Sequence, residues 1–165
     1  MKQVKNLSIA VIAFLAFTTT NAQSKMAHID VKELMSKMPA VIAAQKEIKT
    51  MGETMSTTYK GMVDEYQAKA KKYDEEAATA GDAENQKRQV EVQDMTKRIQ
   101  DYQESAQKQL QEKEATLLRP LQEKLIASIK KIAKLKGFQY VVDAAGLLVA
   151  DGPDMMLDVK KDLGF

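Results

Sequence analysis

Residues 39–66 read PAVIAAQKEIKTMGETMSTTYKGMVDEY, and they open a segment that extends to Gly137 with its main break at Gly81. Apolar residues here recur at spacings of 3, 4 and 4, an eleven-residue period of about 3.67 residues per turn. The period places on one helical face Ile48, Met51, Met55, Tyr59, Met62, Tyr66, Ala70, Tyr73 and Ala77. This pattern predicts a long antiparallel helical hairpin, in which each helix carries an apolar stripe too narrow for a globular core.

The second helix of the predicted hairpin runs from Ala83 to about Lys136 and repeats the period. Gly81 between the helices tolerates the positive φ of a helix C-terminus. Pro120 removes one backbone hydrogen bond and clashes with the carbonyl four residues back, so we expect a kink there. We assign residues 39–118 to the hairpin arm.

Short apolar segments near both ends of the chain predict a small β part. Residues 25–31 alternate like a half-buried strand, while residues 138–143 and 147–150 have strand composition and residues 156–163 have helical spacing. Three short strands cannot hold two such helices alone, so we expect other copies of the chain to cover them. The expected fold is mainly α with a small β-strand body formed by residues 23–38 and 119–165.

The composition argues against an enzyme. The 165 residues include no Cys and one His, so thiol chemistry, Cys-based metal sites and disulfides lack a required part. His28 has no second ligand at strand or helix spacing, which favours a solvated or hydrogen-bonded histidine over a metal ligand. We expect no catalytic residue, no metal and no cofactor.

Residues 1–22 have the features of a secretory signal peptide. Lys2 and Lys5 precede an apolar core at residues 7–17, and Thr20-Asn21-Ala22 forms a small-residue cleavage site. We predict cleavage after Ala22 and a periplasmic mature protein. Removing residues 1–22 takes away two lysines and no acid, which leaves 23 basic against 23 acidic residues. This balance predicts no bulk attraction to nucleic acid or anionic membrane.

Methionine and tyrosine occupy stripe positions where a leucine zipper would place Leu and Ile. Methionine adapts to many partners, so two interpretations stay open: a narrow packing seam between the helices, or a stripe that in part faces a binding space. Gly52 and Gly61 weaken the first helix and favour a compliant arm. The candidate client-binding residues are Met51, Met55, Tyr59, Met62, Tyr66, Tyr73, Met95 and Tyr102.

Several segments of the mature chain together resemble the Skp/OmpH family of periplasmic chaperones. They are MAHIDV (26–31), LRPLQEKL (118–125), KGFQYVVD (136–143) and DVKKDLGF (158–165), joined by the long charged hairpin. The resemblance implies a homotrimer in which the short strands form a β-barrel and the hairpins surround a cavity. It also implies an ATP-independent holdase that keeps unfolded outer-membrane proteins from aggregating. The barrel residues would be Ile29, Val31, Tyr140, Val141, Val142, Leu147, Leu148 and Val149.

One family property is not carried over. Well-known members are strongly basic, which helps them to hold acidic clients and lipopolysaccharide, whereas the mature chain here is near neutral, so we do not transfer a lipopolysaccharide site to it. A different class of protein also fits the hairpin, namely a structural or adaptor coiled coil of the cell envelope. Such a protein would hold one folded partner tightly, and it is the alternative to the holdase.

Overall fold

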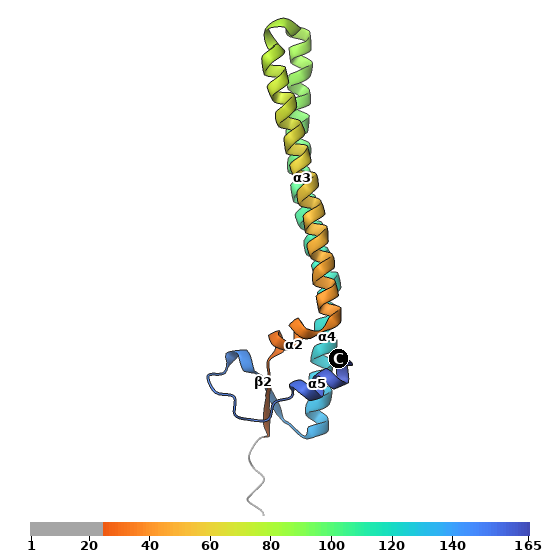
Figure 1. Ribbon diagram of the computed structural model, residues 1–165, viewed down its shortest axis with the longest axis vertical. Helices are drawn as coiled ribbons and strands as arrows, with labels where there is room; N and C mark the ends of the chain where they lie inside the picture. Colours follow the sequence, from red (N-terminus) through yellow and green to blue (C-terminus); the bar gives the residue numbers. More distant parts are fainter. Residues whose placement is uncertain (1–24) are drawn as a thin grey trace, which may run out of the picture. The chain divides into compact units, whose positions relative to one another are not determined.

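The computed structural model describes residues 25–165 (Figure 1). Their elements are strand β1 (Met26–Ile29), helices α2 (Val31–Lys37), α3 (Pro39–Ala80) and α4 (Asp82–Lys136), strand β2 (Tyr140–Asp143), the 3₁₀ turn η1 (Ala144–Gly146) and helix α5 (Met156–Leu163). The predicted signal peptide and its cleavage site lie outside the described residues. The chain divides into an arm unit, Met35–Lys124, and a base unit, which joins the described residues up to Leu34 with Leu125–Phe165.

Helices α3 and α4 form the predicted hairpin (Figure 1). Helix α3 has 42 residues, which correspond to about 60 Å at a rise of 1.5 Å per residue. The chain turns at Gly81, whose φ of 77° is one that residues with a Cβ rarely adopt. The prediction of a mainly helical fold with a long hairpin and a small β part is confirmed.

The ends of the two long helices follow from local chemistry. Pro39 stands in the first turn of α3, where its fixed φ suits a helix and its missing N–H leaves no bond unmade. Asp82 and Glu84 place negative charge at the N-terminus of α4, which favours the helix dipole. Helix α4 continues through Pro120 to Lys136 as one helix. A kink at Pro120 stays a prediction.

The arm unit has a narrow interior. Val41, Ala44 and Met95 are among its few buried side chains, and most other stripe positions are half-buried. Polar pairs also join the two helices, since Lys113 Nζ lies 2.5 Å from Glu47 Oε1. Most of the surface of each helix in the arm unit therefore remains open to solvent.

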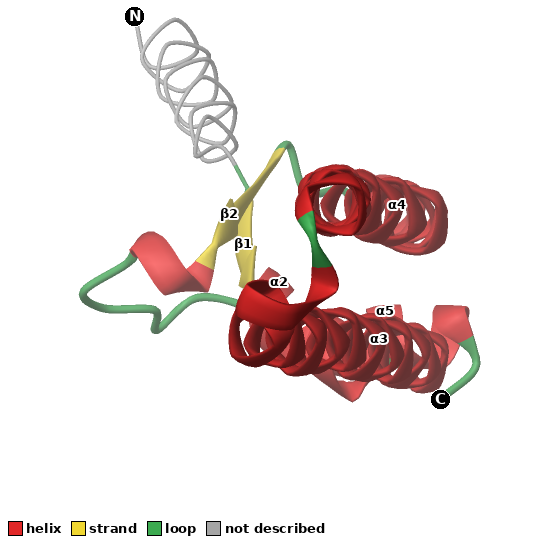
Figure 2. Ribbon diagram, turned by 90° about the horizontal axis from the view of Figure 1, so that it is seen from above, coloured by secondary structure: helices red, strands yellow, loops and turns green. Residues whose placement is uncertain are grey.

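In the base unit, β1 and β2 pair as parallel strands (Figure 2). Met26 stands opposite Tyr140 and Ile29 opposite Asp143. Parallel strands need a long crossover connection, which the helices between them in the sequence provide. Ala27 and Ile29 are buried while the residues before each are not, so β1 shows the alternation of a strand with one covered face.

Helix α5 closes the base unit on the C-terminal part of α4. Met155 and Val159 are fully buried. The Ser128 hydroxyl donates to Asp162 Oδ2 at 2.7 Å, and Lys131 Nζ donates to Asp162 Oδ1 at 2.5 Å. The hydrogen bond from Lys131, with that from Ser128, holds the pKa of Asp162 below its ordinary value. Buried apolar side chains and the two hydrogen bonds to Asp162 thus hold α5 in place.

The Leu125→Ala variant tests this core. Leu125 is 0% exposed, so truncation removes buried methyl groups and leaves a cavity, and we expect a loss of about 2–5 kcal/mol in the free energy of unfolding. Urea titration followed by circular dichroism at one fixed protein concentration measures this loss. The exposed neighbour gives the control Lys124→Ala, for which we expect a change within about 0.5 kcal/mol. Equal stability of the two variants would contradict this core.

Residues 147–150 do not form the predicted third strand. A strand needs a backbone partner, and one edge of β1 already carries β2. The other edge is taken by the C-terminal segment, because His28 N donates to Pro153 O and Met155 N donates to His28 O, both at 3.0 Å. Residues 147–150 therefore take neither edge of β1, and they do not pair with β2 either, so strand propensity alone does not make a strand here.

The turn before this segment, η1, is held by a side-chain cap. Asp143 Oδ1 accepts a hydrogen bond of 3.2 Å from Ala145 N, and this contact caps η1. Strand β2 begins at Tyr140 and not at Phe138, because Gly137, with a φ of 72°, directs the chain out of α4 first. The composition of residues 138–150 therefore predicted more strand than this chain forms by itself.

Candidate functional site

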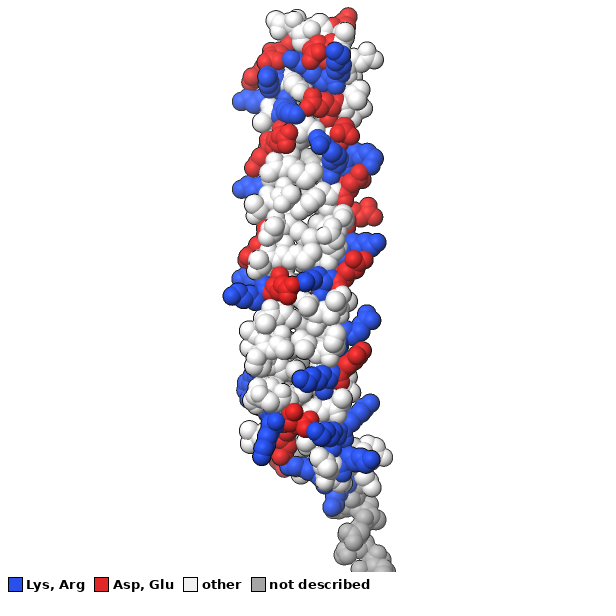
Figure 3. Space-filling view, turned by 90° about the vertical axis from the view of Figure 1, so that its right-hand side faces the viewer, with Lys and Arg blue, Asp and Glu red and all other residues white. Residues whose placement is uncertain are grey.

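The arm unit exposes the eight predicted contact residues unequally. Met95 is 3% exposed and packs between the helices, whereas Tyr59 is 36% exposed. The other six are half-buried: Met51, Met55, Met62, Tyr66, Tyr73 and Tyr102. Figure 3 shows one face of the molecule, on which patches of uncharged side chains are bordered and separated by charged side chains of both signs.

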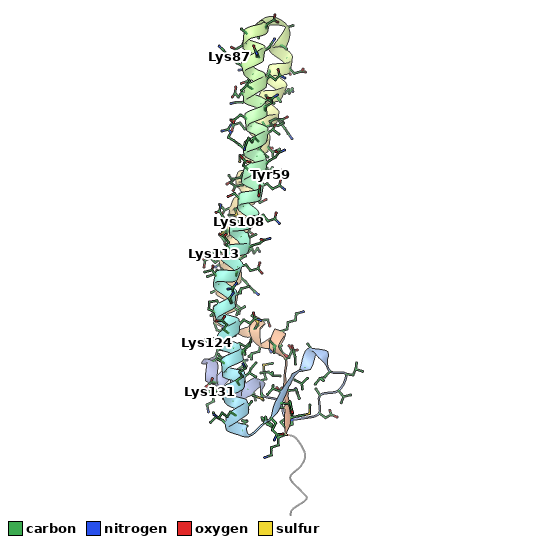
Figure 4. The ribbon with its side chains drawn as sticks, turned by 180° about the vertical axis from the view of Figure 1, so that it is seen from behind. Tyr59, Lys87, Lys108, Lys113, Lys124 and Lys131 are labelled. Carbon is green, nitrogen blue, oxygen red and sulfur yellow. The ribbon has the colours of Figure 1, made fainter. Side chains whose placement is uncertain are left out.

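The structure brings Met51 and Met55 together in a groove of about 680 Å³ that we call the proximal groove. Its lining comes from one face of α3 and one side chain of α4: Ala43, Lys46, Glu47, Thr50, Met51, Thr54, Met55 and Lys113. Figure 4 shows Lys113 nearer than Tyr59 to the end of the arm at which α3 begins. Two of the predicted contact residues thus share an open apolar site.

The threonines of α3 add little polarity to this groove. Thr54 Oγ1 donates to Thr50 O at 2.9 Å, and Thr58 Oγ1 donates to Thr54 O at 3.1 Å. A threonine bonded in this way satisfies its hydroxyl donor within the helix and slightly weakens the helix. The hydroxyl donor of Thr54, which lines the groove, is therefore already satisfied within α3.

Two further methionines of the stripe lie in the middle of the arm in a tighter setting. Met62 and Met95 border a hollow of about 60 Å³ with Ile99, which is too small for a side chain of another molecule. The Tyr102 hydroxyl donates to Met55 O at 3.3 Å. Packing between the helices accounts for these positions, and contact of Met62, Met95 or Tyr102 with a client stays a prediction.

Tyr73 belongs to a polar cluster in the distal part of the arm. Glu91 accepts hydrogen bonds from Lys69 Nζ at 2.5 Å and from the Tyr73 hydroxyl at 2.6 Å. Arg88 lies 4.7 Å from the centre of the Tyr73 ring and 2.7 Å from Glu76. The hydrogen bond from Lys69, followed by that from Tyr73, lowers the pKa of Glu91. The hydrogen bonds that Lys69 and Tyr73 donate to Glu91 raise the pKa values of both donors.

This cluster predicts a pH-dependent opening of the distal arm. The pKa of Glu91 is lowered on folding, so its carboxylate stabilises the arm above the ordinary glutamate pKa of about 4.3. That contribution is lost as the pH falls through the lower pKa of the folded state. Glu91→Gln should remove it at neutral pH, and hydrogen exchange of amides near Lys69 and Tyr73 should become faster.

Glu104→Gln is the matched control for that prediction. Glu104 is an exposed residue of the same helix. We expect hydrogen exchange in the distal arm to be the same in this variant as in the unaltered protein. Equal exchange in the Glu91 and Glu104 variants would contradict a stabilising role for the cluster.

The predicted barrel residues all lie in the base unit. Ile29 is fully buried, Val31, Val141 and Val142 are half-buried, and Tyr140 is exposed. A groove of about 560 Å³, which we call the base groove, has a largely apolar lining that includes Ile29, Val31, Ile126, Phe138, Val141 and Val142. One chain alone thus leaves an apolar hollow beside β2.

The remaining barrel residues, Leu147 to Val149, do not line that groove. Leu148 is 104% exposed and Val149 is 70% exposed. A run of exposed large apolar side chains is unusual on the surface of a protein that acts alone. Residues 147–149 and the base groove are therefore two apolar surfaces of one unit that this chain does not cover.

The described residues contain no group of three or more side chains suited to a metal ion. The Nε2 atom of His28 lies 3.0 Å from the carbonyl oxygen of Gly152, to which an Nε2–H donates. This contact gives the single histidine a structural partner. Within residues 25–165, no helix is both long enough and apolar enough to cross a membrane.

This architecture is similar to that of known proteins. Residues 25–163 match the family model described as outer membrane protein (OmpH-like). The chain belongs to the OmpH-like family. Six chains of solved structures also match this OmpH-like chain. A search of curated proteins gives no match.

One of the solved structures is a crystal structure from Caulobacter crescentus CB15, described as a candidate outer membrane chaperone (OmpH-like). The TM-score is 0.74 at 16% sequence identity, over 88% of this chain and 87% of that chain. At this identity the likeness shows a shared fold. The OmpH-like family and the hairpin fold predicted from the sequence therefore agree with both comparisons.

Sequence reasoning missed parts of both sites. The distal cluster joins Lys69 to Glu91 across the hairpin, and a charged pair 22 positions apart has no periodic signal. The threonines of the proximal groove, Thr50 and Thr54, lie beside the stripe and not on it, so the apolar period gave no signal for them. Phe138 lines the base groove, and the signal for it was its position directly after Gly137, which follows the end of α4.

Proposed function

We propose that this protein is an ATP-independent periplasmic holdase that binds unfolded outer-membrane proteins in the cavity of a homotrimer. Membership of the OmpH-like family supports the chaperone role. The observation that carries the proposal is the proximal groove, an open apolar site on a long helical hairpin. An open site lined by adaptable methionines suits partners that have no fixed shape.

The trimer is the part of the proposal that rests on the base unit. Residues 147–149 and the base groove are distinct apolar surfaces, so each can meet the other surface on a neighbouring copy. Contacts between unlike surfaces form a ring when the rotation between neighbouring copies closes, and a rotation of one third of a turn gives a trimer. We propose residues 23–38 and 119–165 as the trimer-forming body and residues 39–118 as the arm.

The remaining parts of the proposal concern place and mechanism. The signal-peptide pattern of residues 1–22 and the OmpH-like family both support a periplasmic location. The sequence has no glycine-rich phosphate-binding motif, which is consistent with action without nucleotide. We propose that holding needs no chemical step and that the protein is not an enzyme.

A pair of measurements tests the proposal. Light scattering of the mature protein should give three times the mass of one chain. Turbidity should then show that the protein delays aggregation of a urea-unfolded outer-membrane β-barrel protein on dilution, with no nucleotide present. A monomer or dimer without this effect would contradict the holdase. Stoichiometric capture of one folded envelope protein, without protection of the unfolded client, would favour the adaptor alternative.

A further inference from the structure

We propose that the proximal groove binds a short extended segment of unfolded polypeptide in which apolar side chains neighbour an acidic side chain. This inference rests on the proposed holdase function and names the class of segment that the arm selects. It goes beyond general enclosure of a client, because it assigns one site on the arm and one charge preference. The dimensions, the surface chemistry and the charge of the groove carry it.

The dimensions suit an extended peptide. The residues of α3 that line the groove run from Ala43 to Met55, a rise of about 18 Å at 1.5 Å per residue. An extended chain advances about 3.3 Å per residue, so about five residues lie along this length. The volume of about 680 Å³ is within the range of sites that hold small ligands.

The surface of the groove suits apolar side chains. Met51 and Met55 are half-buried, so part of each thioether side chain is free to make contact. Methionine has three rotatable bonds and fills gaps of different shape, which allows one site to accept different aliphatic or aromatic side chains. The Thr54 hydroxyl already donates a hydrogen bond to Thr50 O, so a bound segment need not supply an acceptor for it.

The charge of the groove favours an acidic neighbour. Lys113 and Glu47 form an ion pair of 2.5 Å, which joins α4 to α3 and neutralises both. Lys46 has no ion-pair partner among residues 25–165, so its ammonium is the uncompensated charge of the site. A carboxylate beside the apolar side chains of the occupant would pair with it.

Polypeptide is favoured over lipid by the same ion pair. A hydrocarbon chain in the groove would lie against Lys113 and Glu47 and take away their contact with water, which is unfavourable for charged groups. A peptide brings N–H and C=O groups that can bond to Glu47 and Lys113. Apolar side chains and backbone polar groups in alternation therefore match the groove better than an acyl chain.

The distal arm offers a poorer site. Its groove of about 470 Å³ is lined in part by Asn85, Arg88, Gln89 and Gln93. The Tyr73 hydroxyl there is held by Glu91. An apolar segment would cover these polar groups without replacing their contacts with water. We therefore assign the preference to the proximal groove alone.

The absence of cysteine allows a direct test. An environment-sensitive dye is attached to Ala43→Cys at the end of the groove, and to Ala68→Cys at an exposed position of the same helix as the matched control. The probes are two capped heptapeptides that alternate valine and threonine around a central aspartate or a central lysine. Titration extends to millimolar peptide at low salt, because salt screens an exposed charge pair.

We expect the dye at position 43 to respond and the dye at position 68 to stay unchanged. The aspartate peptide should bind roughly fivefold more tightly than the lysine peptide. Lys46→Glu should reverse this preference. Lys60→Glu, an exposed lysine of the same helix, should leave it unchanged.

Three outcomes would overturn the inference: equal responses at both dye positions or none at either, equal binding of the two peptides, or a response to anionic phospholipid vesicles in place of the peptides. Failure of the holdase function would be seen separately. In that case the unaltered mature protein would not delay aggregation of the unfolded β-barrel client. Protection of that client together with any of the three outcomes would refute the groove and leave the holdase intact.

Discussion

Leu148→Asp in the mature protein is expected to produce a monomer with an intact fold. The Leu148 side chain is 104% exposed in one chain, so aspartate there disturbs no contact of the chain itself. In the proposed trimer the same side chain becomes covered, and burial of an unpaired carboxylate costs several kcal/mol. Light scattering should show at least about 100-fold weaker association, while circular dichroism stays unchanged.

Val90→Asp is the control for this prediction. Val90 is also an exposed apolar residue, at 61%, but it lies on the arm unit. We expect its mass to equal that of the unaltered protein. Val141→Asp should also dissociate the trimer. Because Val141 lines the base groove within one chain, this substitution also disturbs the packing of the chain itself. A Leu148→Asp protein of unchanged mass would refute the assignment of residues 147–149 to the trimer contact.

The second large effect is expected from the double variant Met51→Ser and Met55→Ser. Both side chains line the proximal groove, and their loss removes apolar surface from the proposed client site. At about 1 kcal/mol for each half-buried side chain, the affinity for an unfolded client should fall roughly thirtyfold. Suppression of turbidity at several chaperone concentrations measures this fall.

Ile42→Ser is the matched control for the methionine variant. Ile42 is 52% exposed on the same helix, but it does not line the groove. Client holding should be close to that of the unaltered protein. Both variants should keep the mass of the trimer. Loss of the trimer in the methionine variant would mean that these side chains stabilise the assembly and do not form a separate client site.

Met62 is left out of the double variant for a structural reason. It borders the small hollow that Met95 and Ile99 share, so its truncation would loosen the contact between the helices. A loosened arm would weaken client holding without any lost client contact. Among the methionines of the stripe, Met51 and Met55 therefore give the clearer result.

The sequence by itself determined the helices of this protein and their turn. A period of about 3.67 residues keeps an apolar stripe on one face, and Gly81 allows the positive φ at which the chain reverses. These signals are local, since each depends on residues a few positions apart. The local signals were therefore enough to predict the hairpin and the small β part, and the resemblance of several segments to a known family predicted the OmpH-like family.

The tertiary structure alone decided which stripe residues are open and which strands form. Met55 and Met95 occupy equivalent positions in the pattern, yet one lines a groove and the other is buried, because exposure depends on the register between two helices. Residues 147–150 have strand composition, yet they pair neither with β1, whose two edges are both taken, nor with β2. Register and pairing join residues far apart in the chain, and a local pattern contains no information on them.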